Sequence, residues 1–266
     1  MAVLGFIGIG NMGYAMLKGA LTQYKKEDLL FSSPDAEKNQ KVKEETGVVY
    51  TDNNVELVKQ CKYIVLAVKP QVYDVVLHEI KDSLTENHVV ISIAPGITTD
   101  DVLKIIGDSI KISRAMPNTP ALVNEGMAGL CFGKNAMSEE EKNTVAAFFE
   151  SFGKCEVIDE KLMNAVVCAS GSSPAYVYMF IEALADGAVK YGIPRDKAYK
   201  FAAQTVLGSA KMVLETGEHP GKLKDNVCSP GGTTIAAVAA LEECGFRSSI
   251  MKATDACYEK TVGFKK

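Results

Sequence analysis

The sequence lacks the residue groups that would mark a zinc-binding or a nucleic-acid-binding protein. Its 266 residues include three histidines, and none of the seven scattered cysteines forms a C-x-x-C pair, so we expect no metal site. The formal net charge of −4 offers no basic surface for nucleic acid. An odd number of unclustered cysteines suits a reducing cytoplasm.

Long apolar runs are also missing. The least charged stretch, residues 164–181, is interrupted by SGSSP at 170–174, which makes it a poor membrane span. No basic residues precede the apolar start MAVLGFIGIG, which predicts a first β-strand rather than a signal peptide. We therefore expect a cytoplasmic protein that is neither exported nor inserted in a membrane.

The first half of the chain alternates strand-like and helix-like segments. Helix starts are predicted at Thr98 and at Ser138, where SEEE fits a capping box. This alternation predicts an α/β Rossmann domain with a doubly wound parallel sheet. The apolar runs expected to form its strands are residues 3–7, 29–32, 48–50, 63–68, 89–93 and 110–115.

The second half is predicted to be helical almost throughout, because strand-like runs fade after Ile158. We place the boundary so that 1–159 is the Rossmann domain and 160–266 is an all-α domain. The segment 175–189 is apolar on nearly every face, and a small helical domain cannot easily bury such a helix alone. We favour an obligate homodimer over a central helix buried within one monomer.

A glycine pattern follows the first predicted strand directly. In GFIGIGNMG, Gly8 would permit a tight turn, Gly10 would let the backbone approach a pyrophosphate, and Gly13 would let a helix pack near the strand. The N–H groups at the helix start would face the phosphates. This context favours dinucleotide binding over a purely structural glycine turn.

The end of the second strand bears on the choice of cofactor. An NAD enzyme commonly has Asp or Glu there, whereas this chain has Ser32, Ser33 and Pro34. A carboxylate would repel a 2′-phosphate and serine hydroxyls would not, so NADPH is favoured. Asp35 lies nearby and no arginine does, which keeps NADH as the alternative cofactor.

Three further strand ends should line the same crevice, because ligands of open parallel sheets lie beyond the carboxyl ends of strands. They are AVKP (67–70), IAPG (93–96) and RAMPNTP (114–120). Lys69 could be catalytic or only solvent-facing. Asn118 could bind a ligand or only stabilise a turn.

The reaction is constrained by a missing proton donor. No histidine is placed as an obvious acid, and the apolar helix carries no lysine before Lys190. A cyclic imine would need little general acid catalysis, because protonation of its nitrogen already makes the C=N carbon a good hydride acceptor. The stretch SPGGTTIAAV (229–238) puts bare backbone before a helix start, which would suit the carboxylate of such a substrate.

The stretch LKDNVCSPGGTTIAAVAALEECGFRSSIM (223–251) resembles the signature region of the pyrroline-5-carboxylate reductases. GFIGIGNMG, AVKP, MPNTPALVNEG (116–126) and HPGKLKD (219–225) match as well, and the resemblance covers essentially the whole chain. It implies a Rossmann domain followed by a helical dimerisation domain. It also implies NAD(P)H-dependent reduction of the C=N bond of 1-pyrroline-5-carboxylate to L-proline, the last step of proline biosynthesis, by a homodimer or a ring of such dimers.

The resemblance also implies which residues act. Gly232, Thr233 and Thr234 would bind the substrate, and Thr234 would be the catalytic residue, with its hydroxyl nearest the ring nitrogen. Ser173 stands where the family usually has glycine, and its side chain would narrow a turn facing the site. The cofactor-binding residues it implies are Ile7, Gly8, Ile9, Gly10, Asn11, Met12, Ser33, Asn54, Ala67, Val68, Lys69, Pro70, Ile93, Ala94, Pro95 and Asn226.

Two other functions fit parts of the sequence. A β-hydroxyacid dehydrogenase of the 6-phosphogluconate type shares the glycine-rich start and a helical second half, but it would need a lysine on the long helix, where 175–189 has none. A non-catalytic NADP-binding protein would not need the second anion site that the Gly-Gly-Thr-Thr helix start offers.

Overall fold

The computed structural model describes residues 2–135 and 137–263. The chain divides into two compact units. Unit 1 runs up to Ser172 and resumes at Cys257, and unit 2 is Ser173–Ala256. Residues 160–172 thus lie in unit 1, where Met163 and Val167 pack against Met116 and Cys131.

Unit 1 is built on one eight-stranded sheet with the strand order β3-β2-β1-β4-β5-β6-β7-β8. All neighbouring strands are parallel except β6 and β7. The six strands expected from the sequence are all present. The strand bounds are β1 Ala2–Ile7, β2 Leu29–Ser32, β3 Val49–Thr51, β4 Cys61–Leu66, β5 Val89–Ser92, β6 Lys111–Met116, β7 Gly126–Phe132 and β8 Gly153–Val157.

Strand β7 was not predicted because its sequence, GMAGLCF, is short of the β-branched and aromatic residues that favour strands. Two of its glycines are required by close packing. A Cβ at Gly126 would lie 2.9 Å from the carbonyl oxygen of Phe152, and one at Gly129 would lie 2.9 Å from Val166. Close packing thus requires glycine at positions where a β-branched or aromatic residue would have made the strand recognisable.

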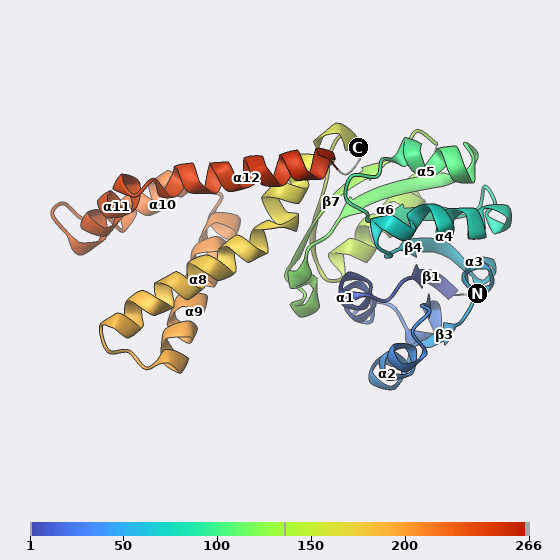
Figure 1. Cartoon of the computed structure of the whole chain (residues 1–266), viewed down its shortest axis with the longest axis horizontal. Coiled ribbons are helices and arrows are strands. Elements are labelled where there is room, and N and C mark those ends of the chain that lie inside the picture. Colours follow the sequence, from blue (N-terminus) through green and yellow to red (C-terminus); the bar gives the residue numbers. More distant parts are fainter. Residues whose placement is uncertain (1, 136, 264–266) are drawn as a thin grey trace. The chain divides into compact units, whose positions relative to one another are not determined.

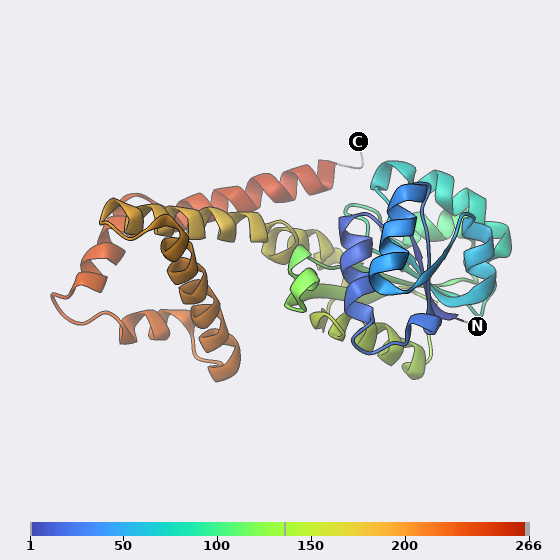
Figure 2. The same cartoon turned by 90° about the horizontal axis from the view of Figure 1, so that it is seen from below.

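Helices cover both faces of the sheet, as a doubly wound fold requires. One face packs against α1 (Asn11–Ala20), α2 (Ala36–Thr46) and α6 (Glu139–Glu150). The other packs against α3 (Asn54–Gln60), α4 (Tyr73–Ile80) and α5 (Thr99–Ile106), which lie together in Figures 1 and 2. Alternate residues of the central strands enter the two cores, as the period of a strand dictates.

Both predicted helix starts are confirmed. Thr98 and Asp101 form a reciprocal capping box at the start of α5, and Ser138 and Glu141 form another at the start of α6. Such caps satisfy backbone N–H groups that have no partner inside the helix, each contributing about 1 kcal/mol.

The helical turns that follow the sheet end within SGSSP, where the sequence is interrupted, and a new helix begins there. The chain forms α7 (Met163–Val166) and then a π-helical turn over Val167–Gly171, closed by the N–H of Ser172 bonding to Val167 at 2.8 Å. Ser173 starts the next helix, and its φ is not in the left-handed region. The position therefore does not require the glycine that is usual in the family.

Unit 2 consists of helices. They are α8 (Ser173–Lys190), α9 (Arg195–Thr216), α10 (Pro220–Asn226), α11 (Thr233–Glu243) and α12 (Phe246–Gly263), whose last residues belong to unit 1. Helices α8 and α9 pack through Ala185, Ala198 and Ala202. Large apolar side chains stay outside this contact: Tyr178 is 60% exposed and Met179 69% exposed. The alternative of a central helix buried within one monomer is therefore wrong.

Candidate functional site

The β1–α1 turn has a geometry that its three glycines dictate. Gly8 has a φ of +95°, and a Cβ there would lie 2.9 Å from the backbone of Ala67. A Cβ on Gly13 would lie 2.3 Å from the carbonyl oxygen of Gly8, so any side chain there would separate the helix from the turn. Gly10 faces open space, with no atom within 4 Å of a Cβ built on it.

Helix α1 begins at this turn without a side-chain cap. Gly10 is the N-cap residue, and no side chain accepts from the first N–H groups of the helix. Such groups carry the positive end of the helix dipole and bind anions. The open backbone at Gly10 and the uncapped helix start therefore fit the pyrophosphate of a dinucleotide.

A cleft of about 660 Å³ opens beside this turn at the carboxyl ends of the parallel strands. It brings together most of the cofactor residues expected from the sequence. The lining residues are Gly10, Asn11, Met12, Lys38, Ala67, Val68, Lys69, Ile93, Ala94, Pro95, Met116, Pro117, Val167, Gly171 and Ser172.

Ser33 and Asn54 do not line this cleft but lie beside it, after β2 and at the start of α3. The Ser32 hydroxyl is buried and donates to Asn54 Oδ1 at 2.6 Å. Asn54 Nδ2 in turn donates to Glu79 at 2.8 Å. The Ser32 hydroxyl is therefore engaged by Asn54, whereas the Ser33 hydroxyl is not.

Asp35, the acidic residue nearest the end of β2, caps α2. Its Oδ1 accepts from the backbone N–H of Lys38 at 3.0 Å. A carboxylate that accepts this bond is held at the helix start, where the helix dipole stabilises its charge.

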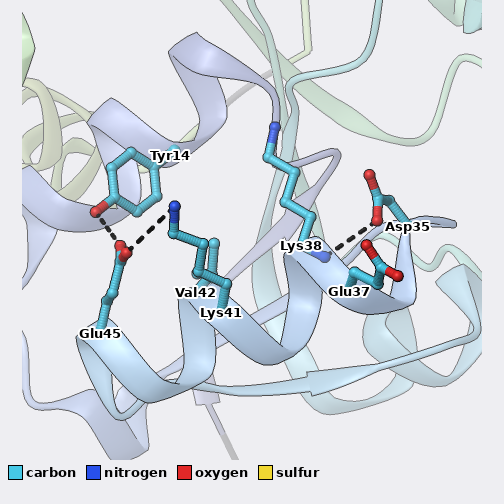
Figure 3. Close-up of a pocket in the computed structure, with 7 residues that line it drawn as sticks. All are labelled: Tyr14, Asp35, Glu37, Lys38, Lys41, Val42 and Glu45. Atoms are coloured by element: carbon cyan, nitrogen blue, oxygen red, sulfur yellow. Dashed lines mark hydrogen bonds and ion pairs between the residues drawn. The ribbon is translucent and has the colours of Figure 1, made fainter.

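A second cavity of about 550 Å³ lies between α1 and α2 (Figure 3). Tyr14 donates to Glu45 at 2.7 Å, and the Lys41 ammonium lies 3.9 Å from the same carboxylate. Lys38 lines both this cavity and the cleft. Sequence reasoning sought an arginine near β2 and overlooked this lysine, although it stands in the first turn of the following helix.

Tyr73 stabilises two of the strand ends beside the cleft. It was not identified from the sequence. Its buried hydroxyl donates to the carbonyl oxygen of Leu66 at 2.8 Å and accepts from the N–H of Ile93 at 3.2 Å. It also lies 3.2 Å from the Ser92 hydroxyl. Burial raises the pKa of Tyr73 to about 12, so it holds the ends of β4 and β5 rather than giving up a proton.

A part-buried ion pair supports the end of β6. The Arg114 side chain is 2% exposed, and its Nη1 lies 3.4 Å from Glu160 Oε1. The Glu160 carboxylate also accepts from the backbone N–H and the hydroxyl of Thr99, both at 2.7 Å. Through these contacts Glu160, which follows the sheet, is held to β6 and to the first residue of α5.

Asn118 stabilises the chain after β6. Its Nδ2 donates to the carbonyl oxygen of Ser170 at 3.0 Å, and its Oδ1 accepts from the N–H of Met127 at 2.8 Å. The structure therefore favours the stabilising role for Asn118 over ligand binding.

The predicted substrate residues lie in unit 2, at the start of α11. Gly231 has a φ of +68°, and Gly232 is the N-cap residue with no side-chain cap on the helix. A Cβ on Gly232 would lie 2.5 Å from the Ser229 hydroxyl. Thr233 and Thr234 are exposed in the first turn, so this helix start presents backbone N–H groups and two hydroxyls to a ligand. Asn226 ends α10 and is exposed.

Among residues 2–135 and 137–263, no group of three or more His, Cys, Asp or Glu side chains is placed to hold a metal ion. Within the same ranges, no helix has the length and apolarity needed to cross a membrane.

Comparison with known proteins gives matches over the whole chain. Residues 160–263 match the family model for pyrroline-5-carboxylate reductase dimerisation, and residues 3–96 match the model for NADP oxidoreductase, coenzyme F420-dependent. The pyrroline-5-carboxylate reductase of Escherichia coli (strain K12) is 49% identical, over 99% of this chain and 98% of that protein. The corresponding protein of Pisum sativum is 39% identical, over 97% and 94%.

A solved structure agrees. The pyrroline carboxylate reductase of Plasmodium falciparum with NADP bound is 37% identical and superimposes with a TM-score of 0.90, over 100% of this chain and 98% of that one. The glycine turn, the cleft at the strand ends and these full-length matches lead to one conclusion. The chain belongs to the pyrroline-5-carboxylate reductase family.

Proposed function

We propose that the protein reduces 1-pyrroline-5-carboxylate to L-proline with NADPH, the last step of proline biosynthesis. A hydride adds to the carbon of the C=N bond, and the nitrogen carries a proton in the product. The observation that carries this proposal is the 49% identity to the Escherichia coli reductase over 99% of the chain. NADPH rather than NADH is supported by the NADP bound to the Plasmodium falciparum relative.

The chain's own residues bind the cofactor and the substrate, orient them, and exclude water from them. The N–H groups at the start of α1 hold the pyrophosphate, and the strand ends at 67–70 and 93–95 hold the rest of the cofactor. When bound, NADPH supplies the hydride. The full set of cofactor residues that we propose is Ile7, Gly8, Ile9, Gly10, Asn11, Met12, Ser33, Asn54, Ala67, Val68, Lys69, Pro70, Ile93, Ala94, Pro95 and Asn226.

The substrate residues that we propose are Gly232, Thr233 and Thr234. The substrate carboxylate accepts from the N–H groups at the start of α11, where no side chain competes for them. The Thr234 hydroxyl lies at the ring nitrogen and orients it. Because an iminium nitrogen already carries its proton, the chain needs no strong acid there.

The alternative of a β-hydroxyacid dehydrogenase is disfavoured by α8. That enzyme would need a lysine within the long helix, and the lysine of α8 is Lys190, its last residue. A non-catalytic NADP-binding protein would leave the uncapped start of α11 without a role.

We further propose that the protein works as a homodimer, or a ring of such dimers, in the cytoplasm. The exposed apolar side chains of α8 and the match of residues 160–263 to a dimerisation family support the dimer. That match begins where we place the functional division, into 1–159 for the cofactor and 160–266 for dimerisation and substrate. The seven unclustered cysteines of the sequence support a reducing compartment.

The test is to mix the purified protein with 1-pyrroline-5-carboxylate and NADPH, follow the loss of cofactor absorbance, and quantify proline. We expect one proline for each NADPH oxidised. No turnover here, combined with turnover of a hydroxyacid, would support the dehydrogenase instead. Tight NADPH binding without turnover of either substrate would support a binding protein.

A further inference from the structure

Lys38 is the cationic side chain of α2 that reaches the cofactor cleft. It is half-buried and lines the cleft together with Gly10, Asn11 and Met12. Figure 3 shows its side chain extending away from the α2 backbone, with a dashed line from its backbone N–H to Asp35 and none from its ammonium.

No carboxylate of the described residues forms an ion pair with the Lys38 ammonium. Lys41, one turn further along, pairs with Glu45 at 3.9 Å and lines only the cavity between α1 and α2. Asp35 and Glu37 are the acidic groups nearest in the sequence, and both are exposed to solvent. Asp35 is in addition held by the helix start that it caps.

The end of β2 has no other side-chain cation lining the cleft. The Ser32 hydroxyl is donated to Asn54, and Ser33 offers a neutral hydroxyl that accepts from the N–H of Asp35 at 3.4 Å. A phosphate monoester carries close to two negative charges near neutral pH, which a hydroxyl alone does not balance. The Lys38 ammonium supplies one positive charge on a flexible side chain, which offsets part of that negative charge.

We propose that Lys38 binds the 2′-phosphate of the cofactor and thereby makes the protein prefer NADPH to NADH. This inference rests on the proposed function, because it assigns a residue to the cofactor that the function requires. Lys38 acts on cofactor choice and not on the hydride step. The ribose hydroxyl that replaces the phosphate in NADH offers no charge to the ammonium, so the contact discriminates between the two cofactors.

The experiment measures binding without substrate, by calorimetry. Four probes are titrated into the wild-type protein and into the Lys38→Ala and Lys41→Ala variants: NADPH, NADH, adenosine 2′,5′-bisphosphate and ADP. We expect Lys38→Ala to raise the dissociation constants of NADPH and adenosine 2′,5′-bisphosphate about 10-fold or more. Those of NADH and ADP should rise less than about 2-fold. Lys41→Ala should bind all four as the wild type does, and Lys38→Arg should retain the preference.

Two outcomes would overturn the inference while leaving the proposed function standing. Equal weakening of NADPH and NADH would mean that Lys38 serves the pyrophosphate. Unchanged NADPH binding in Lys38→Ala would mean that it serves neither phosphate. A wild-type protein that binds no NADPH would overturn the proposed function as well. Matched thermal unfolding curves ensure that the variants are compared in the folded state.

Discussion

At the scale of single residues, the chemistry proposed for this protein depends on one exposed hydroxyl. Thr234 lies in the first turn of α11, after a helix start with no side-chain cap. A hydroxyl there can orient a ring nitrogen while the neighbouring N–H groups hold the carboxylate. The two tasks are separable because they use different atoms.

We therefore expect Thr234→Ala to lower turnover by about 10- to 100-fold, less than the roughly 10²- to 10⁴-fold loss of a proton-transferring group, because the hydroxyl orients the nitrogen and transfers no proton. The dissociation constant for NADPH should change less than about 2-fold, because the hydroxyl is assigned to the substrate. Thr234→Ser keeps a hydroxyl and should recover most of the turnover. Steady-state rates and NADPH titrations make the comparison. Equal turnover in Thr234→Ala and the wild type would remove Thr234 from the reaction.

At the scale of elements, the β1–α1 turn separates two tasks among its glycines. Gly10 faces open space where a cofactor would lie, whereas Gly13 packs on the carbonyl oxygen of Gly8. The same substitution should therefore affect binding at one position and folding at the other.

Gly10→Ala should cost about 1 kcal/mol of stability at most, because alanine is a poorer N-cap than glycine. It should weaken NADPH binding about 10-fold or more, because its methyl group occupies the approach of the pyrophosphate. Gly13→Ala should lower the free energy of unfolding by about 3 kcal/mol, since a Cβ 2.3 Å from backbone forces the helix to move. Urea unfolding and NADPH titration test both variants. The idea fails if Gly10→Ala binds NADPH like the wild type.

Helix α6 is tied to the sheet by a carboxylate whose protonation should be visible in stability. Glu141 caps the helix and lies 3.1 Å from the Lys62 ammonium and 2.9 Å from the Lys111 ammonium. Burial raises the pKa of Glu141, but hydrogen bonds from Lys111, the N–H of Ser138 and Lys62 outweigh it and lower the pKa to about 2.

Because the unfolded chain binds this proton near pH 4.5 and the folded chain near pH 2, the stabilisation is present above about pH 5 and is lost as the pH falls towards 2. We expect Glu141→Gln to reduce the free energy of unfolding by about 2 kcal/mol at pH 6 and by much less at pH 3. Urea unfolding at both values tests this. A cost that is the same at pH 3 and pH 6 would show that the charge contributes nothing.

Local features of these elements were predictable from the sequence, and contacts distant in sequence were not. The glycine turn, the strands β1 to β6 and both capping boxes follow from residues close together in the chain. Tyr73 and Lys38 were missed because their roles depend on partners from other elements, namely Leu66 and Ile93 for Tyr73 and the β1–α1 turn for Lys38. The π-helical turn over Val167–Gly171 was not predicted either, although the interruption at SGSSP that follows it was.

At the scale of the whole molecule, unit 2 leaves too much apolar surface uncovered for a lone chain. Met179 on α8 is 69% exposed, and Tyr178 and Phe201 are also open to solvent. Several large apolar side chains on one helix pair mark an interaction surface, whereas a single one is ordinary. A second copy of the chain would bury them.

Met179→Glu should therefore raise the dissociation constant of the dimer about 30-fold or more, because it places an unpaired charge in the interface. Val75 provides the matched control. It is 70% exposed on α4 in unit 1, and Val75→Glu should leave the assembly unchanged. Analytical ultracentrifugation over a range of concentrations distinguishes the two. A Met179→Glu protein with the wild-type mass would place the interface elsewhere.

The return of α12 to unit 1 has a consequence for the order of folding. Cys257 packs on the cluster of Met116, Cys131, Met163 and Val167, and its thiol lies 3.3 Å from the Ser172 hydroxyl. These partners are synthesised before unit 2 and Cys257 after it. On the ribosome, the nucleotide-binding unit must therefore wait for the whole of unit 2 before this part of its core closes. Translation order makes its completion one of the last events of folding.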